Sequence, residues 1–266
     1  MMAAARSYGE HSPRTMGGAA GGYDSDHEHM MGAVSSDDQV LTDALDVKVR
    51  HGFIRKVFSI VAVQLLFTAV LATPFVAYKP AAQHFVVQYQ ALVVLAMFAP
   101  LILICCAMCN PGLMRTYPQN YLFLGLMTLA LSVTVGVATL QYDAKSVLSV
   151  AVMTGLLTGS LALFALQTRV DFTGLGPYLF TFCLGLGLIG LFMMFVPMSH
   201  PIMMVYSGLA ACLFCFYIIF DIQMIVGGKH TARQFAVDEY CFAALHLYMD
   251  IINLFLHLLR LFGDRN

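Results

Sequence analysis

The stretch that decides the fold is CFAALHLYMDIINLFLHLLRLF, residues 241–262. It is long enough to span a membrane, because about 20 apolar residues cross a bilayer, yet it contains Asp250. A second such stretch, MMVYSGLAACLFCFYIIFDIQMIV (203–226), contains Asp221. A carboxylate at membrane depth costs several kcal/mol unless it faces protein, water or a partner charge. These two acids, alone in the most apolar stretches, predict a proton- or cation-sensitive site.

The composition is that of an integral membrane protein. Of the 266 residues, 59% are hydrophobic and 11% are charged, whereas soluble domains contain about 25% charged residues. The net charge of −1 argues against nucleic acid as a partner, because there is no basic face to bind phosphates.

Seven apolar runs of membrane-spanning length predict an all-α membrane protein, a seven-transmembrane helix bundle. They cover 57–78, 88–109, 120–140, 146–166, 178–198, 202–226 and 238–262. The fifth and sixth runs are so close that we expect a tight hairpin. Residues 1–47 are rich in Gly, Ala, Ser, His and Asp without an apolar period, which predicts a disordered segment before a membrane domain of residues 48–266.

The orientation follows from the basic residues near the span ends. One side has Lys48, Arg50, Arg55, Lys56, Arg115, Arg169, Lys229 and Arg233, and the other has Lys79, Lys145, Arg260 and Arg265. Because cytosolic ends carry the excess of Lys and Arg, we expect a cytosolic N-terminus. The seventh run is the most polar, which leaves its full crossing open.

The polar residues of the seventh run fall on one helical face. Within about 80° of arc lie Glu239, His246, Asp250, Asn253, His257 and Arg260. Such a stripe cannot face lipid, where polar groups have no partners. We therefore expect a central seventh helix whose stripe faces a hydrated cavity or the sixth helix. The alternative role is a structural network that only joins helices.

The two aspartates define the predicted site. Tyr217, four residues before Asp221, shares its face and is expected to donate a hydrogen bond to it. If Asp221 and Asp250 meet, both cannot ionise at low cost, and they would share one proton. A pair of carboxylates also suits Ca²⁺, as a bound or permeant ion. No other cofactor is expected.

An enzymatic alternative rests on histidines. His246, Asp250 and His257, with His200 elsewhere, resemble the ligands of an intramembrane zinc hydrolase. No nucleophile or second histidine pair occurs at matching depth, so a non-enzymatic function is preferred.

The cysteines predict free thiols rather than a disulfide framework. Six lie in or at the ends of apolar runs and are expected to be buried: Cys105, Cys106, Cys183, Cys212, Cys215 and Cys241. Cys105, Cys106 and Cys109 are also near a cytosolic membrane boundary, where S-palmitoylation occurs.

Several motifs, in order, resemble the Bax-inhibitor-motif family, and its Lifeguard branch most. They are VRHGFIRKVFSIVAVQLLFT (49–68), FALQTRVDFTGLG (164–176), FDIQMIVGGKH (220–230) and DEYCFAALHLYMDIINLFLHLLRLFG (238–263). In the first motif, Gln64 and Thr68 are expected to turn toward the bundle as packing residues. The likeness covers residues 48–263.

This resemblance implies a seven-helix bundle with a central seventh helix in an intracellular membrane (endoplasmic reticulum, Golgi or vacuole). It also implies dampening of programmed cell death, a pH-dependent Ca²⁺ leak, and a pH-sensing aspartate pair at Asp221 and Asp250. The expected partners are the bilayer, Ca²⁺ and H⁺, and other membrane proteins of cell-death control. A rival hypothesis is a non-conducting protein that acts only by binding such partners.

Two positions depart from the family pattern. Family members with a described latch have an Arg in the second span, but residues 88–109 contain no basic residue. A cation for Asp221 must then come from Arg55, Arg115, Lys229 or Arg233. Where the family usually has Asn, this chain has His246, which could add a second titrating group or serve only in packing.

Overall fold

The computed structural model describes residues 36–196, 199–227 and 233–265. Within that part the chain forms helices and no named strand. They are α1 (Ser36–Ala77), α2 (Lys79–Gln88), α3 (Gln90–Cys109), η2 (Pro111–Met114), α4 (Gln119–Thr139), α5 (Ala144–Gln167), η3 (Thr173–Leu175), α6 (Gly176–Phe195), α7 (His200–Val226), η4 (Val237–Glu239) and α8 (Tyr240–Phe262). Residues Asp46–Asn266 form one compact unit.

Seven helices of the described residues are long and apolar enough to cross a membrane, as the sequence predicted. Two details differ from the prediction. The first helix begins at Ser36, ahead of the predicted first span of 57–78 and within the segment 1–47 that was predicted to be disordered; Ser and two Asp residues at its start favour helix initiation. The remaining part of the segment predicted to be disordered, residues 1–35, lies outside the described residues. The short helix α2 was also missed; Pro80 in its first turn suits a helix start.

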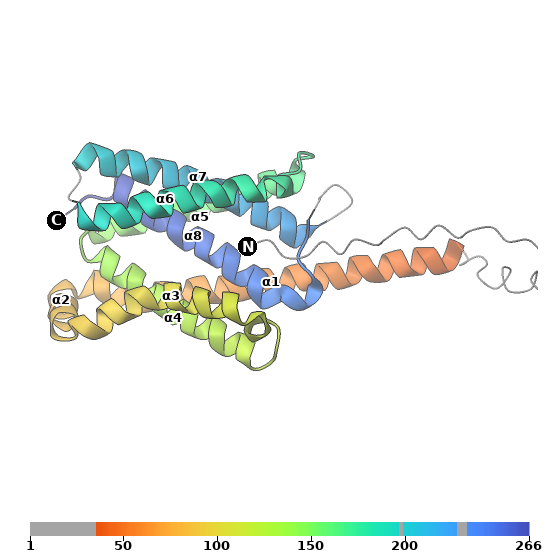
Figure 1. Ribbon diagram of the computed structural model, residues 1–266, viewed down its shortest axis with the longest axis horizontal. Coiled ribbons are helices and arrows are strands. Elements are labelled where there is room, and N and C mark those ends of the chain that lie inside the picture. Colours follow the sequence, from red (N-terminus) through yellow and green to blue (C-terminus); the bar gives the residue numbers. More distant parts are fainter. Residues whose placement is uncertain (1–35, 197–198, 228–232, 266) are drawn as a thin grey trace, which may run out of the picture. The chain divides into compact units, whose positions relative to one another are not determined.

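The last helix lies at the centre of the bundle. In the most apolar window of α8, 67% of the residues are buried, against 6% for α3 and for α6. It packs on α7, α5 and α4 and runs between α1, α3 and α4 on one side and α6 and α7 on the other (Figure 1). The predicted central position is therefore confirmed.

The far end of α8 is joined to the connection between α4 and α5. The amide of Asp143 donates to the carbonyl of Asp264 (3.0 Å), and the Ser146 hydroxyl donates to the Asp264 carboxylate (3.0 Å). Lys79 donates to the carbonyl of Tyr142 (2.6 Å) at the same end. These contacts fix the C-terminal end of α8 at the end of the bundle opposite to where the helix starts. The helix therefore runs the full length of the bundle despite its polar side chains.

One face of α1 packs into the bundle. Its buried residues recur every three or four positions, as expected for one side of a helix: Phe53, Val57, Val61, Gln64, Thr68 and Ala72. Gln64 and Thr68 are each 4% exposed, which confirms their predicted inward orientation.

A buried hydroxyl network joins α1, α4 and α8. Gln64 Nε2 donates to Thr128 Oγ1 (2.8 Å), and Ser132 Oγ lies 3.0 Å from Thr68 Oγ1. Because the Thr68 hydroxyl donates to the carbonyl of Gln64, the Tyr248 hydroxyl is the donor in its 2.8 Å contact with Thr68. Hydrogen bonds of this kind hold helices together where lipid offers no alternative partner.

Replacing Tyr248 by Phe is expected to destabilise the bundle by about 1 kcal/mol, because it removes one buried interhelical hydrogen bond and little volume. Thermal unfolding in detergent measures this. The matched control is Tyr178→Phe, since Tyr178 is 74% exposed on α6 and should lose nothing. An unchanged Tyr248→Phe midpoint would show that the network contributes no stability.

The cysteines are free, but most are not buried as predicted. Only Cys241 is buried, Cys183 and Cys215 are half-buried, and Cys105, Cys106, Cys109 and Cys212 are exposed. The prediction failed because in a membrane protein apolar helices also turn apolar side chains outward, toward lipid.

Candidate functional site

The packing of α7 along α8 brings Asp221 and Asp250 together. Asp221 is 1% exposed and Asp250 is 8% exposed, and the two carboxyl groups are close enough to interact with each other. Both oxygens of Asp221 and Oδ2 of Asp250 accept no hydrogen bond from a donor of the described residues. A proton on either carboxyl group would bridge the two, whereas two ionised groups would repel each other without a compensating donor.

His246 is the basic side chain next to this pair. Its Nδ1 lies 4.0 Å from Asp221 Oδ2, and its ring packs edge-on against Phe242 with centroids 4.4 Å apart. Among the described residues, no other Lys, Arg or His nitrogen lies within 4.0 Å of either aspartate.

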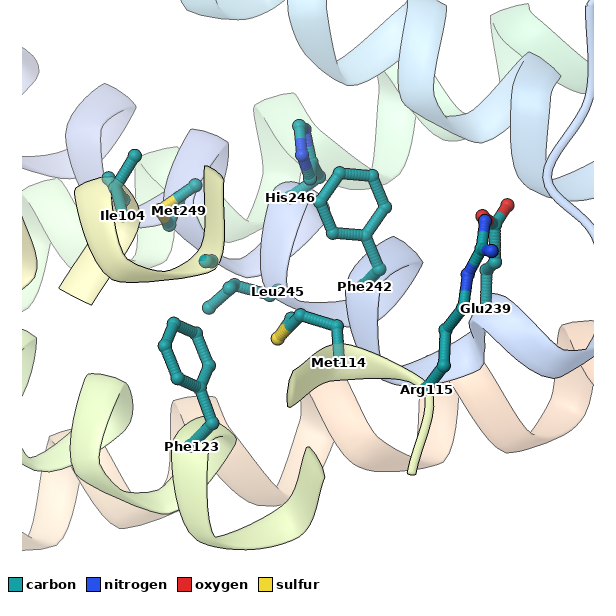
Figure 2. Close-up of a pocket in the computed structure, with 10 residues that line it drawn as sticks. Ile104, Met114, Arg115, Phe123, Glu239, Phe242, Leu245, His246 and Met249 are labelled. Carbon is teal, nitrogen blue, oxygen red and sulfur yellow. The ribbon is translucent and has the colours of Figure 1, made fainter. Parts of the chain in front are cut away.

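His246 also lines a cavity. A pocket of 460 Å³ between α3, α4 and α8 is lined by Ile104, Ala107, Met114, Arg115, Phe123, Glu239, Phe242, Leu245, His246 and Met249. Figure 2 shows His246 and Phe242 at one part of its wall and Arg115 beside Glu239 at another. The His246 side chain is 39% exposed, while that of Asp221 is 1% exposed. The imidazole is therefore the accessible neighbour of an inaccessible carboxyl group.

Of the cations proposed for Asp221 from the sequence, none that the structure describes lies within 4.0 Å of it. Arg115 Nη2 donates to Glu239 Oε1 at 2.5 Å, and this ion pair raises the pKa of Arg115. Arg55 is exposed on α1, the backbone amide of Arg233 donates to Thr173, and Lys229 lies outside the described residues. The expectation that Arg55 or Arg115 pairs with Asp221 is wrong, because Arg55 points outward and Glu239 is closer to Arg115.

The hydrogen bond expected from Tyr217 to Asp221 is not formed, since neither Asp221 oxygen has a donor in the described part. Tyr217 instead interacts with Cys183 of α6, and its ring contacts Phe220 edge-on. A shared helix face did not suffice to predict this hydrogen bond, because α6 packs against α7 there and the Tyr217 side chain contacts α6 instead.

The polar stripe of α8 is divided among several partners. The Asn253 side chain donates to the carbonyl of Met249 on its own helix (2.8 Å). The His257 ring stacks on Phe214 of α7 at 5.7 Å and meets Tyr206 edge-on at 5.8 Å, while its Nδ1 has no partner among the described residues. The stripe is therefore not one surface: Asp250 and His257 face α7, the sixth span, while Glu239 and His246 line the pocket beside α3 and α4.

The ligands of the zinc hypothesis are not gathered. Across residues 36–196, 199–227 and 233–265, no group of three or more His, Cys, Asp or Glu side chains could hold a metal ion. The aspartate pair has carboxylate oxygens of the kind that Ca²⁺ prefers, and three of them have no hydrogen-bond partner among the described residues.

Arg50 holds the end of α7 that follows Asp221, and nothing in the sequence except its charge pointed to this role. Its guanidinium donates to three carbonyl oxygens: Met224 at 2.7 Å, Val226 at 3.1 Å and Phe235 at 2.6 Å. The last carbonyls of a helix lack partners within the helix, so Arg50 caps α7 from α1.

Two further residues define this end of α7. Gly227 ends the helix with φ = 64°, and a Cβ there would lie 2.8 Å from Arg50 Nη2, so glycine is required by both backbone and space. The Gln223 side chain accepts from the amide of Phe172 (2.8 Å) and donates to the carbonyl of Val170 (2.9 Å). The segment after Asp221 is thus tied to α1 and to the connection before α6.

Residues 50–266 match the family described as "Inhibitor of apoptosis-promoting Bax1". The chain belongs to this Bax-inhibitor family. It is 37% identical over 220 residues to Protein LIFEGUARD 4 of Arabidopsis thaliana, covering 81% of this chain and 85% of that protein. It is 34% identical to human Protein lifeguard 3 over 228 residues, covering 83% and 71% of the two chains.

A third relative, from yeast, matches a similar share of the chain. Bax inhibitor 1 of Schizosaccharomyces pombe is 31% identical over 215 residues, covering 81% of this chain and 77% of that protein. The resemblance noted from the motifs is confirmed. The family description and the names of these relatives are regulatory rather than enzymatic, and membership of the Bax-inhibitor family implies a part in the control of cell death.

Proposed function

We propose that this member of the Bax-inhibitor family regulates programmed cell death from an intracellular membrane, through a Ca²⁺ leak that responds to pH at Asp221 and Asp250. Family membership supports the cell-death role. The single observation that carries the mechanism is a pair of buried, adjacent carboxyl groups with unpartnered oxygens between the two central helices. The chain's N-terminus is cytosolic in this proposal, because the basic residues cluster at the span ends of that side.

The mechanism is a change of charge between α7 and α8. When the pair holds a proton, the two carboxyl groups are bridged, and the helices stay closely packed. When the proton leaves, two negative charges repel each other and attract Ca²⁺, whose preferred ligands are carboxylate oxygens. Flux therefore rises as pH rises through the range where the pair loses its proton. The conformational equilibrium shifts only by the differential affinity of H⁺ and Ca²⁺ for the two states.

The titratable groups around the pair are few. His246 of α8 lies 4.0 Å from Asp221, while Tyr217 of α7 and Cys183 of α6 interact with each other nearby. The α5 sequence from Ser146 to Gln167 contains no titratable residue. The pH response is therefore assigned to the two aspartates, with His246 as the neighbour able to shift it.

The test is Ca²⁺ release from proteoliposomes that contain the purified full-length protein and a Ca²⁺ indicator, measured from pH 6 to pH 8. The proposal expects protein-dependent flux that increases with pH. No flux above that of protein-free liposomes at any pH would overturn it. That result would favour the non-conducting alternative, in which deletion of residues 1–47 should remove the cell-death phenotype.

Replacing His246 by Asn is expected to move the midpoint of the flux–pH curve upward by roughly 0.5–1 pH unit. The imidazole lies 4.0 Å from Asp221, so ionisation of that carboxylate draws a proton onto the ring, and the resulting positive charge stabilises the carboxylate. Loss of the imidazole therefore makes deprotonation of the pair harder. The matched control is His257→Asn, which removes a histidine of the same helix face whose ring packs on Phe214 and Tyr206. If the flux–pH curves of His246→Asn and the unmodified protein have equal midpoints, His246 does not affect the titration and serves only in packing.

A further inference from the structure

Three exposed cysteines lie together at the end of α3. Cys105, Cys106 and Cys109 are free and exposed, and α3 ends at Cys109. At about 100° per residue these thiols share an arc of about 100°. Three nucleophilic side chains are thus presented on one side of one helix end.

The opposite side of α3 faces the protein. Ile104 and Ala107 pack against the core and line the pocket shown in Figure 2. On the helical wheel their mean direction is about 180° from that of the three cysteines. Because α3 is a membrane-spanning helix at the edge of the bundle, the cysteine side of it faces lipid.

The depth of this cluster is that of a membrane surface. Cys105 lies about 6 Å from the end of α3, at a rise of 1.5 Å per residue. The connection that follows contains Arg115, which pairs with Glu239, and Lys56 lies over the Tyr240 ring beside it. This is the end of the bundle that the basic residues assign to the cytosol. By contrast, the exposed Cys212 lies within α7 (His200–Val226), roughly 18 Å from one helix end and roughly 21 Å from the other.

We propose that Cys105, Cys106 and Cys109 are sites of S-acylation with long-chain acyl groups. The thiolate attacks the thioester carbonyl of a long-chain acyl-coenzyme A. A new sulfur–carbon bond forms, coenzyme A leaves as its thiol with the cysteine proton, and nothing is oxidised or reduced. The acyl chains enter the bilayer along the lipid-facing side of α3. Since only 6% of the α3 span is buried, such anchors would hold a helix that has little packing of its own and forms one wall of the pocket beside His246.

The experiment is acyl exchange on the full-length protein expressed in eukaryotic cells. Free thiols are blocked, thioesters are cleaved with hydroxylamine, and the released thiols are coupled to a polyethylene glycol maleimide. The expected result is a hydroxylamine-dependent ladder of up to three added masses, lost in Cys105→Ala/Cys106→Ala/Cys109→Ala and retained in the matched control Cys212→Ala. Size-exclusion chromatography shows that each variant is folded.

Three results would overturn the assignment of acylation to Cys105, Cys106 and Cys109. No hydroxylamine-dependent shift in the unmodified protein, or a ladder that persists in the triple variant, overturns the proposal. A ladder lost in Cys212→Ala also overturns it, because it would place the thioester in the middle of the membrane. The readout does not involve Ca²⁺, so its result is independent of the proposed leak.

Discussion

In proteoliposomes, Asp221→Asn and Asp250→Asn should each abolish the pH dependence of Ca²⁺ flux. Asparagine keeps the size of the side chain but cannot ionise, so neither variant can pass from a shared proton to the two repelling negative charges that separate α7 from α8 in this mechanism. A single-proton equilibrium changes about tenfold per pH unit on its steep part, which corresponds to about 1.4 kcal/mol. We expect the unmodified protein to follow this dependence, and each variant to change by less than about twofold between pH 6 and pH 8.

The matched control is Asp143→Asn, which removes a carboxylate with a 57% exposed side chain at the opposite end of the bundle. It should preserve the full pH profile. The aspartate pair is excluded as the sensor if both Asn variants retain that profile. The buried position of the pair, with Asp221 1% exposed, is the reason for predicting an all-or-none loss rather than a modest shift.

The second large effect is expected from Arg50→Met, which should lower the apparent Tm in detergent by about 10 °C. The substitution removes the guanidinium donor from the carbonyls of Met224, Val226 and Phe235, and the Met224 carbonyl then keeps the amide of Phe235 (3.1 Å). Hydrogen bonds to charged groups contribute about 1.5–3 kcal/mol each, and the loss of such a network costs about 3 kcal/mol or more. For a domain of this size, 1 kcal/mol corresponds to about 2–4 °C.

Arg55→Met is the matched control, because Arg55 is an exposed arginine of the same helix. Its Tm should change little. Arg50→Lys should recover only part of the loss, since a single ammonium group cannot match the planar fork of a guanidinium. Equal Tm values for Arg50→Met and Arg55→Met would show that the Arg50 hydrogen bonds do not hold the end of α7.

The membrane helices could be predicted from the sequence because their cause is local. About 20 apolar residues are needed to cross a bilayer, and turn residues such as Pro80 and Gly227 mark helix ends. The position of the seventh helix also followed from local pattern, because a polar stripe must avoid lipid. The helical residues 36–47 and helix α2 were missed, since both lack the long apolar signal.

The site was predictable only in part, for a physical reason. Asp221 and Asp250 stood out because an ionisable group in an apolar stretch is costly. The predicted partner of Tyr217 was wrong, because Tyr217 interacts with Cys183, which is distant in the chain. The role of Arg50 was missed, because it depends on distant carbonyl groups such as that of Phe235.

The sequence by itself determined seven apolar helices, their order and the two aspartates, because hydrophobicity and charge act on each segment alone. Only the tertiary structure decided that the carboxyl groups of Asp221 and Asp250 meet, that His246 lies 4.0 Å from one of them, and that Arg50 caps α7. Those contacts depend on how helices pack and rotate against each other, and helical periodicity within a segment leaves that rotation open.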